Sequence, residues 1–422
     1  MRAFVRHIAS AARVAAIVRE RVVAIWAFHT YPAYHAPAPL RMLRIAGVLG
    51  MIGGIHSPYF FTHMMHKFIP GILVVLLCGA AVALAVTLTR PNAETTRSTT
   101  EPTPTTEEGD TTVVDSKRGR DDIEMIVDGN TREFIVYRPE QLNEDEVVPV
   151  VFMFHGSGGT GEKFFDISGW REKADQEGFM VVFPTALKYH VYSEEKVVNG
   201  VVKYDVAVYQ TKWNQFGLEE QLDPAFPDQT LADDVKFTQE MVAYVQENYA
   251  TDPDRFYATG FSNGAAFTAR LLVQMWDVFA AFGPSGAGRV TNDMFTRTNE
   301  YADGAFVPRP TMLMLGELDP KLTYSAGVDA FPMDETLAEP GYVMKDYVID
   351  IYLDLLGLSD TYAYERTNRV SHFTFSDSAE TPSADAFHVL IMENMKHIYP
   401  NGTNYPLEAA DMYWTFFEAY TL

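Results

Sequence analysis

The sequence predicts an α/β domain with a mostly parallel central sheet and helices on both faces. Short continuous apolar runs alternate with longer amphipathic segments from residue 147 onward. An apolar run without polar alternation is typical of a strand that is buried on both faces, as strands of parallel sheets are. Strands that alternate with helices therefore indicate a parallel sheet between two helical layers.

The individual elements follow from the same patterns. A hairpin is expected first, because alternating strands at 123–127 and 132–137 flank an Asp-Gly-Asn turn at 128–130. Buried strands are then expected at 147–154, 179–183, 255–259, 310–315 and 386–392. Helices are expected at 162–177, 231–249, 265–275, 341–356 and 406–420. Segment 188–228 interrupts this series and contains a hairpin signal at Asn199-Gly200, so it is either a surface insertion that borders the substrate cleft or a purely structural excursion.

Charge divides the chain into two regions with different surroundings. The first 90 residues hold nine Lys and Arg residues and one acid, Glu20, whereas the remainder holds 24 basic and 55 acidic residues. An acidic domain of this kind repels nucleic acid and anionic lipid, so neither is an expected partner. The single cysteine, Cys78, lies before the domain, which excludes disulfides, cysteine-ligated zinc and a thiol nucleophile within it.

Four segments are predicted: a basic region of unassigned role at 1–67, a hydrophobic segment at 68–90, a disordered linker at 91–120 and the folded catalytic domain at 121–422. The apolar run 68–88 has the length of a membrane span, and it is either an anchor or a cleaved signal peptide. Lys67 and several arginines precede it, so the domain is expected outside the cytoplasm, as a secreted, periplasmic or membrane-anchored protein. The linker is rich in Thr, Pro and Glu and has too little apolar surface to fold.

The segment from Gly260 to Gly264, GFSNG, carries the strongest catalytic signal. It lies between the predicted strand 255–259 and the predicted helix 265–275. A strand, G-x-S-x-G and a helix in this order form a nucleophile elbow, in which a tight turn exposes the serine hydroxyl above the sheet. Ser262 is therefore the predicted nucleophile, and a glycine-rich turn with an ordinary serine is the alternative.

A serine nucleophile requires a base, which in this chain order follows the serine. Three histidines follow Ser262. His372 and His388 lie within predicted strands, where packing explains them. His397 lies in a loop after the strand 386–392, the place where a catalytic base is expected, and it is the predicted base.

The acid that orients the base should follow the preceding strand, 310–315. Asp319 lies shortly after that strand and is the predicted acid, and Glu317 is its competitor. The chemistry of such a triad uses neither a metal nor an organic cofactor, and none is predicted.

Backbone N–H groups are the expected partners of the oxyanion that forms during acyl transfer. One should belong to Asn263 and the other to Ser157, in the glycine-rich loop His155-Gly156-Ser157-Gly158-Gly159. His155 and Gly156 of this loop are expected to border the substrate cleft. The loop lacks the lysine of a P-loop and the spacing of a dinucleotide-binding fingerprint, which argues against nucleotide binding and leaves a tight structural turn as the alternative.

With these motifs, the chain resembles the polyhydroxybutyrate depolymerase and feruloyl esterase group of α/β-hydrolases over about 121–422. The resemblance rests on PVVFMFHGSGG, WN at 213–214, DPDRFYATGFSNGA, LGELDP and NMKHIYPNG. It implies an α/β-hydrolase fold, secretion and hydrolysis of carboxylic esters, of either hydroxyalkanoates or feruloyl and acetyl groups on plant polysaccharide. It also implies the catalytic roles predicted above and places Trp213 near the cleft. The residues before His397 and before the acid loop depart from the group's pattern, so the resemblance does not define the substrate pocket.

The predicted function is a secreted or membrane-tethered serine esterase that acts through an acyl-enzyme on an ester substrate, with polymeric esters among the expected substrates. A catalytically inactive α/β-hydrolase domain that serves as an adhesion or binding module is one alternative. A serine peptidase with the same machinery is another. Membrane contact is expected only through residues 68–88 when they remain uncleaved, and the sequence predicts no oligomeric state.

Overall fold

The computed structural model describes residues 119–422 apart from 194–195, 199–200, 204–205, 368 and 377–386. All of them belong to one unit that spans Asp110–Leu422. The predicted segments 1–67 and 68–90 lie outside the described residues, as does the linker up to residue 118. The first strand begins at Gly119, so it includes the last two residues of the predicted linker. No helix within the described part of the chain is long and apolar enough to cross a membrane.

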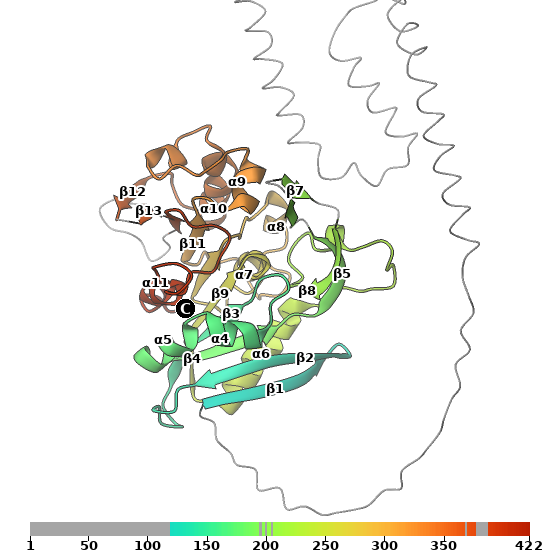
Figure 1. Cartoon of the computed structure of the whole chain (residues 1–422). Coiled ribbons are helices and arrows are strands. Elements are labelled where there is room, and N and C mark those ends of the chain that lie inside the picture. Colours follow the sequence, from blue (N-terminus) through green and yellow to red (C-terminus); the bar gives the residue numbers. More distant parts are fainter. Residues whose placement is uncertain (1–118, 194–195, 199–200, 204–205, 368, 377–386) are drawn as a thin grey trace, which may run out of the picture. The chain divides into compact units, whose positions relative to one another are not determined.

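A ten-stranded sheet runs through the domain (Figure 1). Its central strands β4, β3, β9, β10, β11 and β14 lie parallel in that spatial order. Antiparallel strands extend it at both edges, with β2 and β1 beyond β4, and β13 and β12 beyond β14. The strands of this sheet are β1 (Gly119–Val127), β2 (Asn130–Arg138), β3 (Val148–Phe154), β4 (Met180–Thr185), β9 (Thr251–Phe261), β10 (Ala281–Ser285), β11 (Thr311–Gly316), β12 (Tyr362–Arg366), β13 (Val370–Phe375) and β14 (Phe387–Met392). The parallel centre with a leading hairpin is the α/β-hydrolase architecture, which confirms the predicted fold class.

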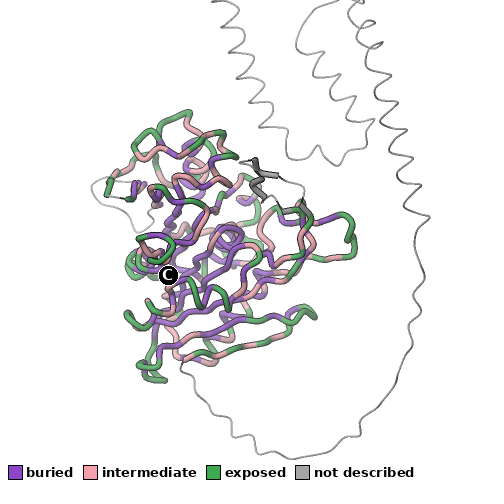
Figure 2. The backbone as a smooth tube through the Cα atoms, viewed as in Figure 1, coloured by how far each residue is buried: buried purple, intermediate pink, exposed green. Residues whose placement is uncertain are grey.

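Each face of the sheet contributes to a separate hydrophobic core. In β3, Val150 and Phe152 pack into one core, whereas Val151 and Met153 pack into the other, and all four are fully buried. The first core is covered by α6 (Asp234–Asn248), α7 (Asn263–Gln274) and α10 (Asp350–Leu356), and the second by α4 (Gly161–Ile167), α5 (Trp170–Glu177) and α11 (Ala409–Phe417). Figure 2 shows the buried strands at the centre and the exposed segments at the periphery. A strand covered on both faces must be apolar at every position, which explains the uninterrupted run VPVVFMF.

Short helical segments complete the described part of the domain: α8 (Asn292–Phe295), α9 (Pro320–Ala326), the 3₁₀ turns η2 (Glu219–Gln221) and η3 (Glu335–Ala338), and the π-helix η4 (Lys345–Ile349). The helix predicted at 341–356 is therefore η4 followed by α10. The helix predicted at 162–177 was wrong as a single element. Gly169 between α4 and α5 has φ +79°, a conformation that glycine adopts without strain, and it turns the chain between the two helices.

Strands β10 and β12 were not predicted. The sequence of β10, AFGPS, contains glycine and proline, both of which disfavour strands. The tertiary structure requires that glycine, because a Cβ on Gly283 would come within 2.7 Å of the Tyr413 ring in α11. Burial between two parallel neighbours thus overrides the local preference of this segment.

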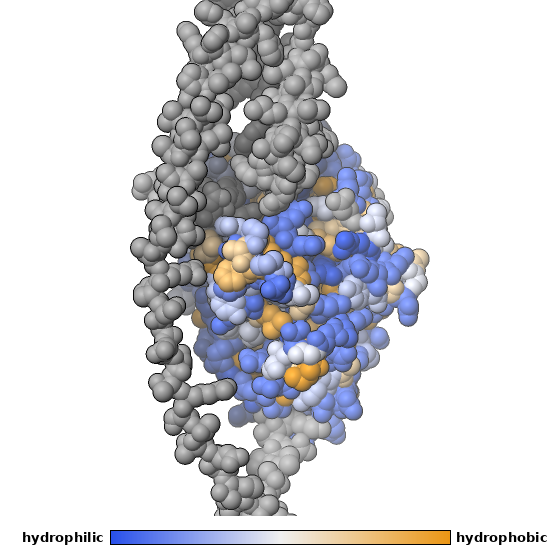
Figure 3. Space-filling model, turned by 90° about the vertical axis from the view of Figure 1, so that its right-hand side faces the viewer, coloured by the Kyte–Doolittle hydropathy of each residue, from blue (hydrophilic) through white to orange (hydrophobic). Residues whose placement is uncertain are grey.

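The predicted insertion forms two small antiparallel pairs. Strand β5 (Lys188–Ser193) pairs with β8 (Val206–Thr211), and β6 (Lys196–Val198) pairs with β7 (Val201–Lys203). The second pair confirms the hairpin predicted from Asn199-Gly200. The inner side of the first pair has a small core of its own, formed by Tyr189, Val191 and Leu218. The face of the domain drawn in Figure 3 is mostly hydrophilic with separate apolar patches, as its acidic composition suggests.

Candidate active site

Ser262 occupies a strained turn between β9 and α7. Its backbone has φ 54° and ψ −117°, a region that residues with a Cβ rarely adopt. The Ser262 N–H donates to the carbonyl of Ser285 at 2.8 Å, which ties the turn to the end of β10. The residue is 7% exposed and its side chain does not cap α7. The hydroxyl is therefore free of the helix it precedes.

The two glycines of the turn are required by close backbone contacts. A Cβ on Gly260 would lie 2.4 Å from the carbonyl oxygen of Gly264. A Cβ on Gly264 would lie 2.1 Å from the carbonyl oxygen of Phe154, at the end of β3. Both distances are shorter than any real Cβ contact, so the G-x-S-x-G spacing follows from how closely α7 approaches the sheet.

Ser262, His397 and Asp319 form a hydrogen-bonded chain. His397 Nδ1 lies 2.7 Å from Asp319 Oδ2, and His397 Nε2 lies 2.9 Å from Ser262 Oγ. A carboxylate only accepts hydrogen bonds, so Nδ1–H donates to Asp319 and Nε2 is left to accept from the serine hydroxyl. The Asp319 side chain is 1% exposed and that of His397 is 12% exposed. The structure thus brings together the three residues predicted as nucleophile, base and acid.

The loops that carry the acid and the histidine are joined by their backbones. A Cβ on Gly316, at the end of β11, would lie 2.4 Å from the Met395 carbonyl oxygen, so only glycine permits this approach. The Leu318 N–H donates to the same carbonyl at 2.9 Å. Glu317 Oε2 accepts the N–H of Asn394 at 2.6 Å, where Asn394 has φ +56°. Glu317, the competing candidate for the acid, is thus occupied in holding the histidine loop.

The other two histidines after Ser262 contact each other instead of the serine. His372 Nε2 and His388 Nδ1 lie 2.8 Å apart across β13 and β14, and the His388 ring packs on Phe416 of α11. Burial lowers the pKa of both imidazoles, that of His388 to about 3. Both are therefore neutral packing residues at neutral pH. Among the described residues, no group of three or more His, Cys, Asp or Glu side chains is arranged to hold a metal ion.

The predicted oxyanion donors lie beside the serine. A Cβ on Gly156 would be 3.3 Å from Ser262 Cβ, so the glycine-rich loop passes directly next to the nucleophile. The N–H groups of Gly158 and Gly159 donate to the carbonyls of Thr211 and Gly156, respectively. Within the described ranges, the N–H groups of Ser157 and Asn263 have no hydrogen-bond partner. Both can therefore donate to a substrate oxygen.

All three predicted cleft residues are buried. His155 and Trp213 are both 0% exposed. His155 Nε2 accepts the Ala186 N–H at 3.0 Å, and burial lowers the His155 pKa to about 4. The Trp213 indole N–H donates to the His155 carbonyl at 2.9 Å. Their side chains support the glycine-rich loop from below and do not line an open cleft, whereas Gly156 is next to Ser262.

Sequence reasoning did not identify Phe261 or Gly286 as site residues. The Phe261 ring lies 4.9 Å from the His397 ring. A Cβ on Gly286, which has φ +68°, would come within 2.9 Å of that phenyl ring and 3.5 Å of His397 Cε1. Gly286 follows β10, and because that strand was not predicted, nothing in the sequence marked the glycine after it as a strand-end position.

Comparisons with known proteins point to esterases. Feruloyl esterase B of Piromyces equi is 24% identical over 201 residues, which cover 47% of this chain and 31% of that protein. The protein named putative esterase NocK of Nocardia uniformis subsp. tsuyamanensis is 28% identical over 212 residues, which cover 50% of this chain and 52% of the relative. The chain thus spans about half the length, or less, of these curated relatives. No family model matches it.

Solved structures with a similar fold include other esterases. The acetyl xylan esterase from Aspergillus awamori has a TM-score of 0.44 at 13% identity and covers 71% of this chain and 99% of its own. A feruloyl esterase module from Clostridium thermocellum, complexed with sinapinate, has a TM-score of 0.36 at 14% identity, covering 66% and 81%. The assignment of the fold to this chain rests on its own sheet topology.

Proposed function

We propose that the domain is a serine hydrolase of carboxylic esters that works through an acyl-enzyme. The observation that carries this proposal is the hydrogen-bonded chain from Ser262 through His397 to Asp319, beside two unpaired backbone N–H groups. Nucleophile, base and orienting acid within hydrogen-bond reach, with oxyanion donors next to the nucleophile, are the arrangement that acyl transfer requires.

The acylation step follows from this geometry. Ser262 Oγ attacks the ester carbonyl carbon while its proton passes to His397 Nε2, and Asp319 stabilises the imidazolium. The carbonyl oxygen becomes an oxyanion that accepts hydrogen bonds from the N–H groups of Ser157 and Asn263. Collapse of the tetrahedral intermediate breaks the ester C–O bond, and His397 donates its proton to the departing alcohol.

Deacylation repeats these roles with water as the nucleophile. His397 Nε2 accepts a proton from the water that attacks the acyl-enzyme, and the oxyanion forms again at the same two N–H groups. His397 then returns the proton to Ser262 Oγ as the carboxylic acid leaves. Water is the only co-reactant, and the free enzyme is restored without an oxidant or a reductant.

For the substrate, we propose either a hydroxyalkanoate polyester or oligomer, cleaved at its own ester bonds, or a feruloyl or acetyl ester of a plant polysaccharide. The names of the curated relatives, which include feruloyl esterase, and the motif resemblance support this class. Activity on a panel of feruloyl, acetyl, hydroxybutyrate and peptide substrates distinguishes among these ester classes and separates an esterase from a peptidase. Turnover of the peptide alone would overturn the esterase proposal.

The decisive test of serine catalysis is Ser262→Ala with a short p-nitrophenyl ester. We expect kcat/KM to fall by about 10⁴-fold or more, because the variant has no nucleophile. A fluorophosphonate probe should label the wild-type protein at Ser262 and leave the variant unlabelled. Undiminished turnover by Ser262→Ala would mean a different nucleophile, and an unlabelled, inactive wild type would favour a binding module.

We also propose that the domain acts outside the cytoplasm. The apolar run 68–88, the basic residues before it and the Thr-, Pro- and Glu-rich linker after it support this location. Cell fractionation followed by N-terminal sequencing of the purified protein tests the proposal. A start at or beyond Val86, after the small residues Ala83 and Ala85, indicates a cleaved signal. An intact N-terminus in the membrane fraction indicates an anchor, and recovery in the cytoplasm contradicts both.

A further inference from the structure

The segment Thr211–Asn214, which begins at the last residue of β8 within the insertion, contacts both halves of the proposed oxyanion site. On one side, Thr211 Oγ1 donates to the Gly159 carbonyl at 2.6 Å and its own carbonyl accepts the Gly158 N–H at 2.9 Å. These two bonds hold the loop that carries Ser157 from its C-terminal side. The Trp213 indole holds the same loop from its N-terminal side, through the carbonyl of His155.

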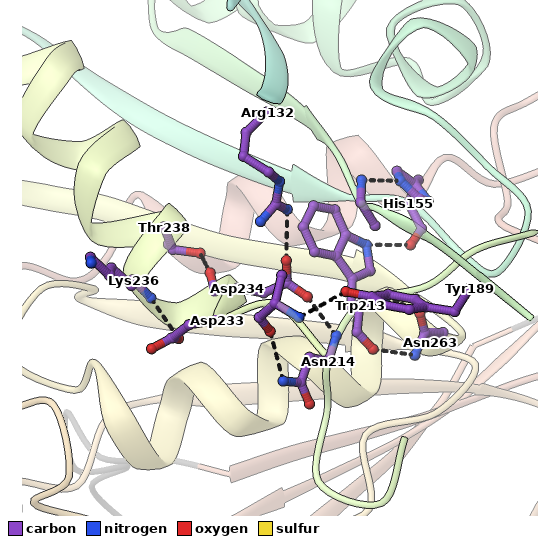
Figure 4. A network of polar contacts seen from close by, with 12 residues as sticks. Arg132, His155, Tyr189, Trp213, Asn214, Asp233, Asp234, Lys236, Thr238 and Asn263 are labelled. Carbon is purple, nitrogen blue, oxygen red and sulfur yellow. Dashed lines mark hydrogen bonds and ion pairs between the residues drawn. The ribbon is translucent and has the colours of Figure 1, made fainter. Parts of the chain in front are cut away.

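The other side of the segment holds the residue after the nucleophile. The Trp213 N–H donates to Asn263 Oδ1 at 2.7 Å, and Asn263 Nδ2 donates to the Trp213 carbonyl at 3.2 Å. The Asn263 side-chain amide therefore accepts one hydrogen bond from the Trp213 backbone and donates another to it. Figure 4 shows Trp213 between His155 and Asn263, with its backbone facing the Asn263 amide.

Buried charges anchor this segment. Asp234, the first residue of α6, accepts the Asn214 N–H at 2.6 Å with one carboxylate oxygen and pairs with Arg132 Nη2 at 2.6 Å with the other. The Asp234 side chain is 0% exposed and that of Arg132 is 1% exposed. The Asn214 carbonyl also accepts a hydrogen bond from Arg270 Nη1 of α7 at 2.5 Å. The segment is thus tied to β2, α6 and α7 at once.

The desolvation cost of burying the Arg132–Asp234 ion pair indicates that the pair does more than stabilise the fold. Among the described residues, Arg132 Nε and Nη1 have no hydrogen-bond partner, and the guanidinium packs on the Phe237 ring at 3.8 Å. A buried ion pair that is only partly satisfied contributes little net stability, and apolar residues of similar volume often replace such pairs without loss. Asp234 accepts the backbone N–H of Asn214, and the preceding residue, Trp213, is the one that contacts Asn263. That placement suits a positioning role.

We propose that Thr211–Asn214, anchored by Asp234, is a brace that fixes the Ser157 and Asn263 N–H groups relative to each other. The two donors come from separate strand ends, β3 and β9. The peptide that carries the Ser157 N–H is also held from within its own loop, where His155 Nδ1–H donates to the Gly156 carbonyl at 2.7 Å, but that bond does not reach Asn263. A single rigid segment that is hydrogen-bonded to the Ser157 loop and to Asn263 fixes the distance between the two N–H donors. The proposal rests on the proposed function, because it assigns these residues to the oxyanion site of that reaction.

The first test compares Thr211→Val with the matched control Thr238→Val. Each substitution deletes one buried hydroxyl that donates to a carbonyl, from Thr211 to Gly159 and from Thr238 to Asp234. Thr211→Val should lower kcat for a short p-nitrophenyl ester by about 10-fold, a fraction of what loss of a whole oxyanion donor costs, with KM within about 2-fold. Thr238→Val should keep kcat within about 2-fold of wild type at a similar loss in melting temperature.

An inhibitor readout separates positioning from general loosening. Phenylboronic acid binds when Ser262 Oγ adds to boron and its proton passes to His397, which leaves a tetrahedral anion with an oxygen in the oxyanion site. Its inhibition constant should rise by the same factor as kcat falls in Thr211→Val, and should not change in Thr238→Val. Equal effects of the two valine variants, or none from Thr211→Val, would overturn the brace.

The second test examines whether Asp234 acts through Asn263. Asp234→Asn should lower kcat by about 10-fold in the wild-type background and by a clearly smaller factor when Asn263 is already alanine, because only the route to the Ser157 loop then remains. Additive effects would contradict the relay. If Asp234→Asn does not fold, the comparison of the two valine variants still decides the proposal.

The brace and the proposed function fail in different ways. A wild-type domain that hydrolyses no ester of the panel and takes no fluorophosphonate label removes the proposed function itself. An active wild type whose kcat does not change in Thr211→Val retains that function and removes only the brace.

Discussion

The two sides of the candidate site are built by different means. On the nucleophile side, one continuous stretch, Gly260–Gly264, sets the position of Ser262 through backbone contacts that exclude any Cβ at both glycines. On the histidine side, two loops that are 78 residues apart in the chain meet after β11 and β14. They are joined by the Leu318 N–H to the Met395 carbonyl and by the Glu317 carboxylate to the Asn394 N–H. The first side is therefore encoded locally, whereas the second depends on which strands become neighbours.

This difference predicts which substitutions should affect stability and which should affect catalysis. The nucleophile side has no spare volume, so added atoms should cost stability before they affect chemistry. The histidine side is held by polar contacts, so isosteric changes there should leave the fold intact and affect the reaction. The predictions below test this contrast in order of expected effect.

The largest effect is expected on the histidine side, from Asp319→Asn. The amide keeps an oxygen to cap α9, where Asp319 Oδ1 accepts the Lys321 N–H, but it favours the wrong imidazole tautomer. We expect kcat to fall by about 10⁴-fold with little change in melting temperature. Glu317→Gln is the matched control two residues away, and its amide oxygen still accepts the Asn394 N–H. Its kcat should stay within about 2-fold, and the opposite ranking would make Glu317 the acid.

On the nucleophile side, Gly264→Ala should destabilise the fold by about 3 kcal/mol, the upper end of overpacking costs. The added methyl would overlap the Phe154 carbonyl at 2.1 Å, and backbone atoms cannot move aside as a flexible side chain can. Gly304→Ala is the control, because Gly304 has φ +99° with no atom within 4 Å of a Cβ. It should cost only the backbone strain of about 1 kcal/mol. Urea denaturation measures both, and equal losses would show that contact at Gly264 is unimportant.

The smallest effect concerns acid stability at the β13–β14 edge, next to the histidine side. Burial holds the pKa of His388 at about 3, below the ordinary 6.5, and that of its partner His372 also below its ordinary value. A lowered imidazole pKa contributes stability that is complete above pH 6.5 and is lost as the pH falls towards the folded pKa. We expect the lowered pKa of His388 to reduce the free energy of unfolding by roughly 1–2 kcal/mol between pH 7 and pH 5, and His372 to act in the same direction.

The matched variant for that prediction is His388→Phe, which keeps a ring against Phe416 and removes one titrating group. Its unfolding free energy should depend less steeply on pH than that of the wild type over the same interval. His155, whose pKa burial lowers to about 4, remains in both proteins and sets a common background. Identical slopes would mean that His388 is already solvated in the native state.

Much of the site was predictable because its signals are local or follow chain order. Ser262 is marked by five consecutive residues, and His397 by its place after an apolar run typical of a buried strand. The choice of Asp319 over Glu317 rested on analogy with the motif order and on the family resemblance, because both residues follow the same strand. The structure gives the physical difference, since Asp319 faces the imidazole and Glu317 turns to the Asn394 N–H.

The parallel α/β architecture, the nucleophile turn and the order of the candidate catalytic residues could be predicted from the amino-acid sequence, because they depend on apolar periodicity, glycine spacing and chain order. The packed fold was needed to show that β10 is a strand, that Trp213 and His155 lie beneath the loop they support, and that Asp234 contacts the segment bonded to Asn263. Asp234 begins an amphipathic helix, where an acidic residue is expected from helix capping alone. Its contacts with Arg132 and Asn214 join residues 102 and 20 positions away, and such pairings exist only once the strands and helices have packed.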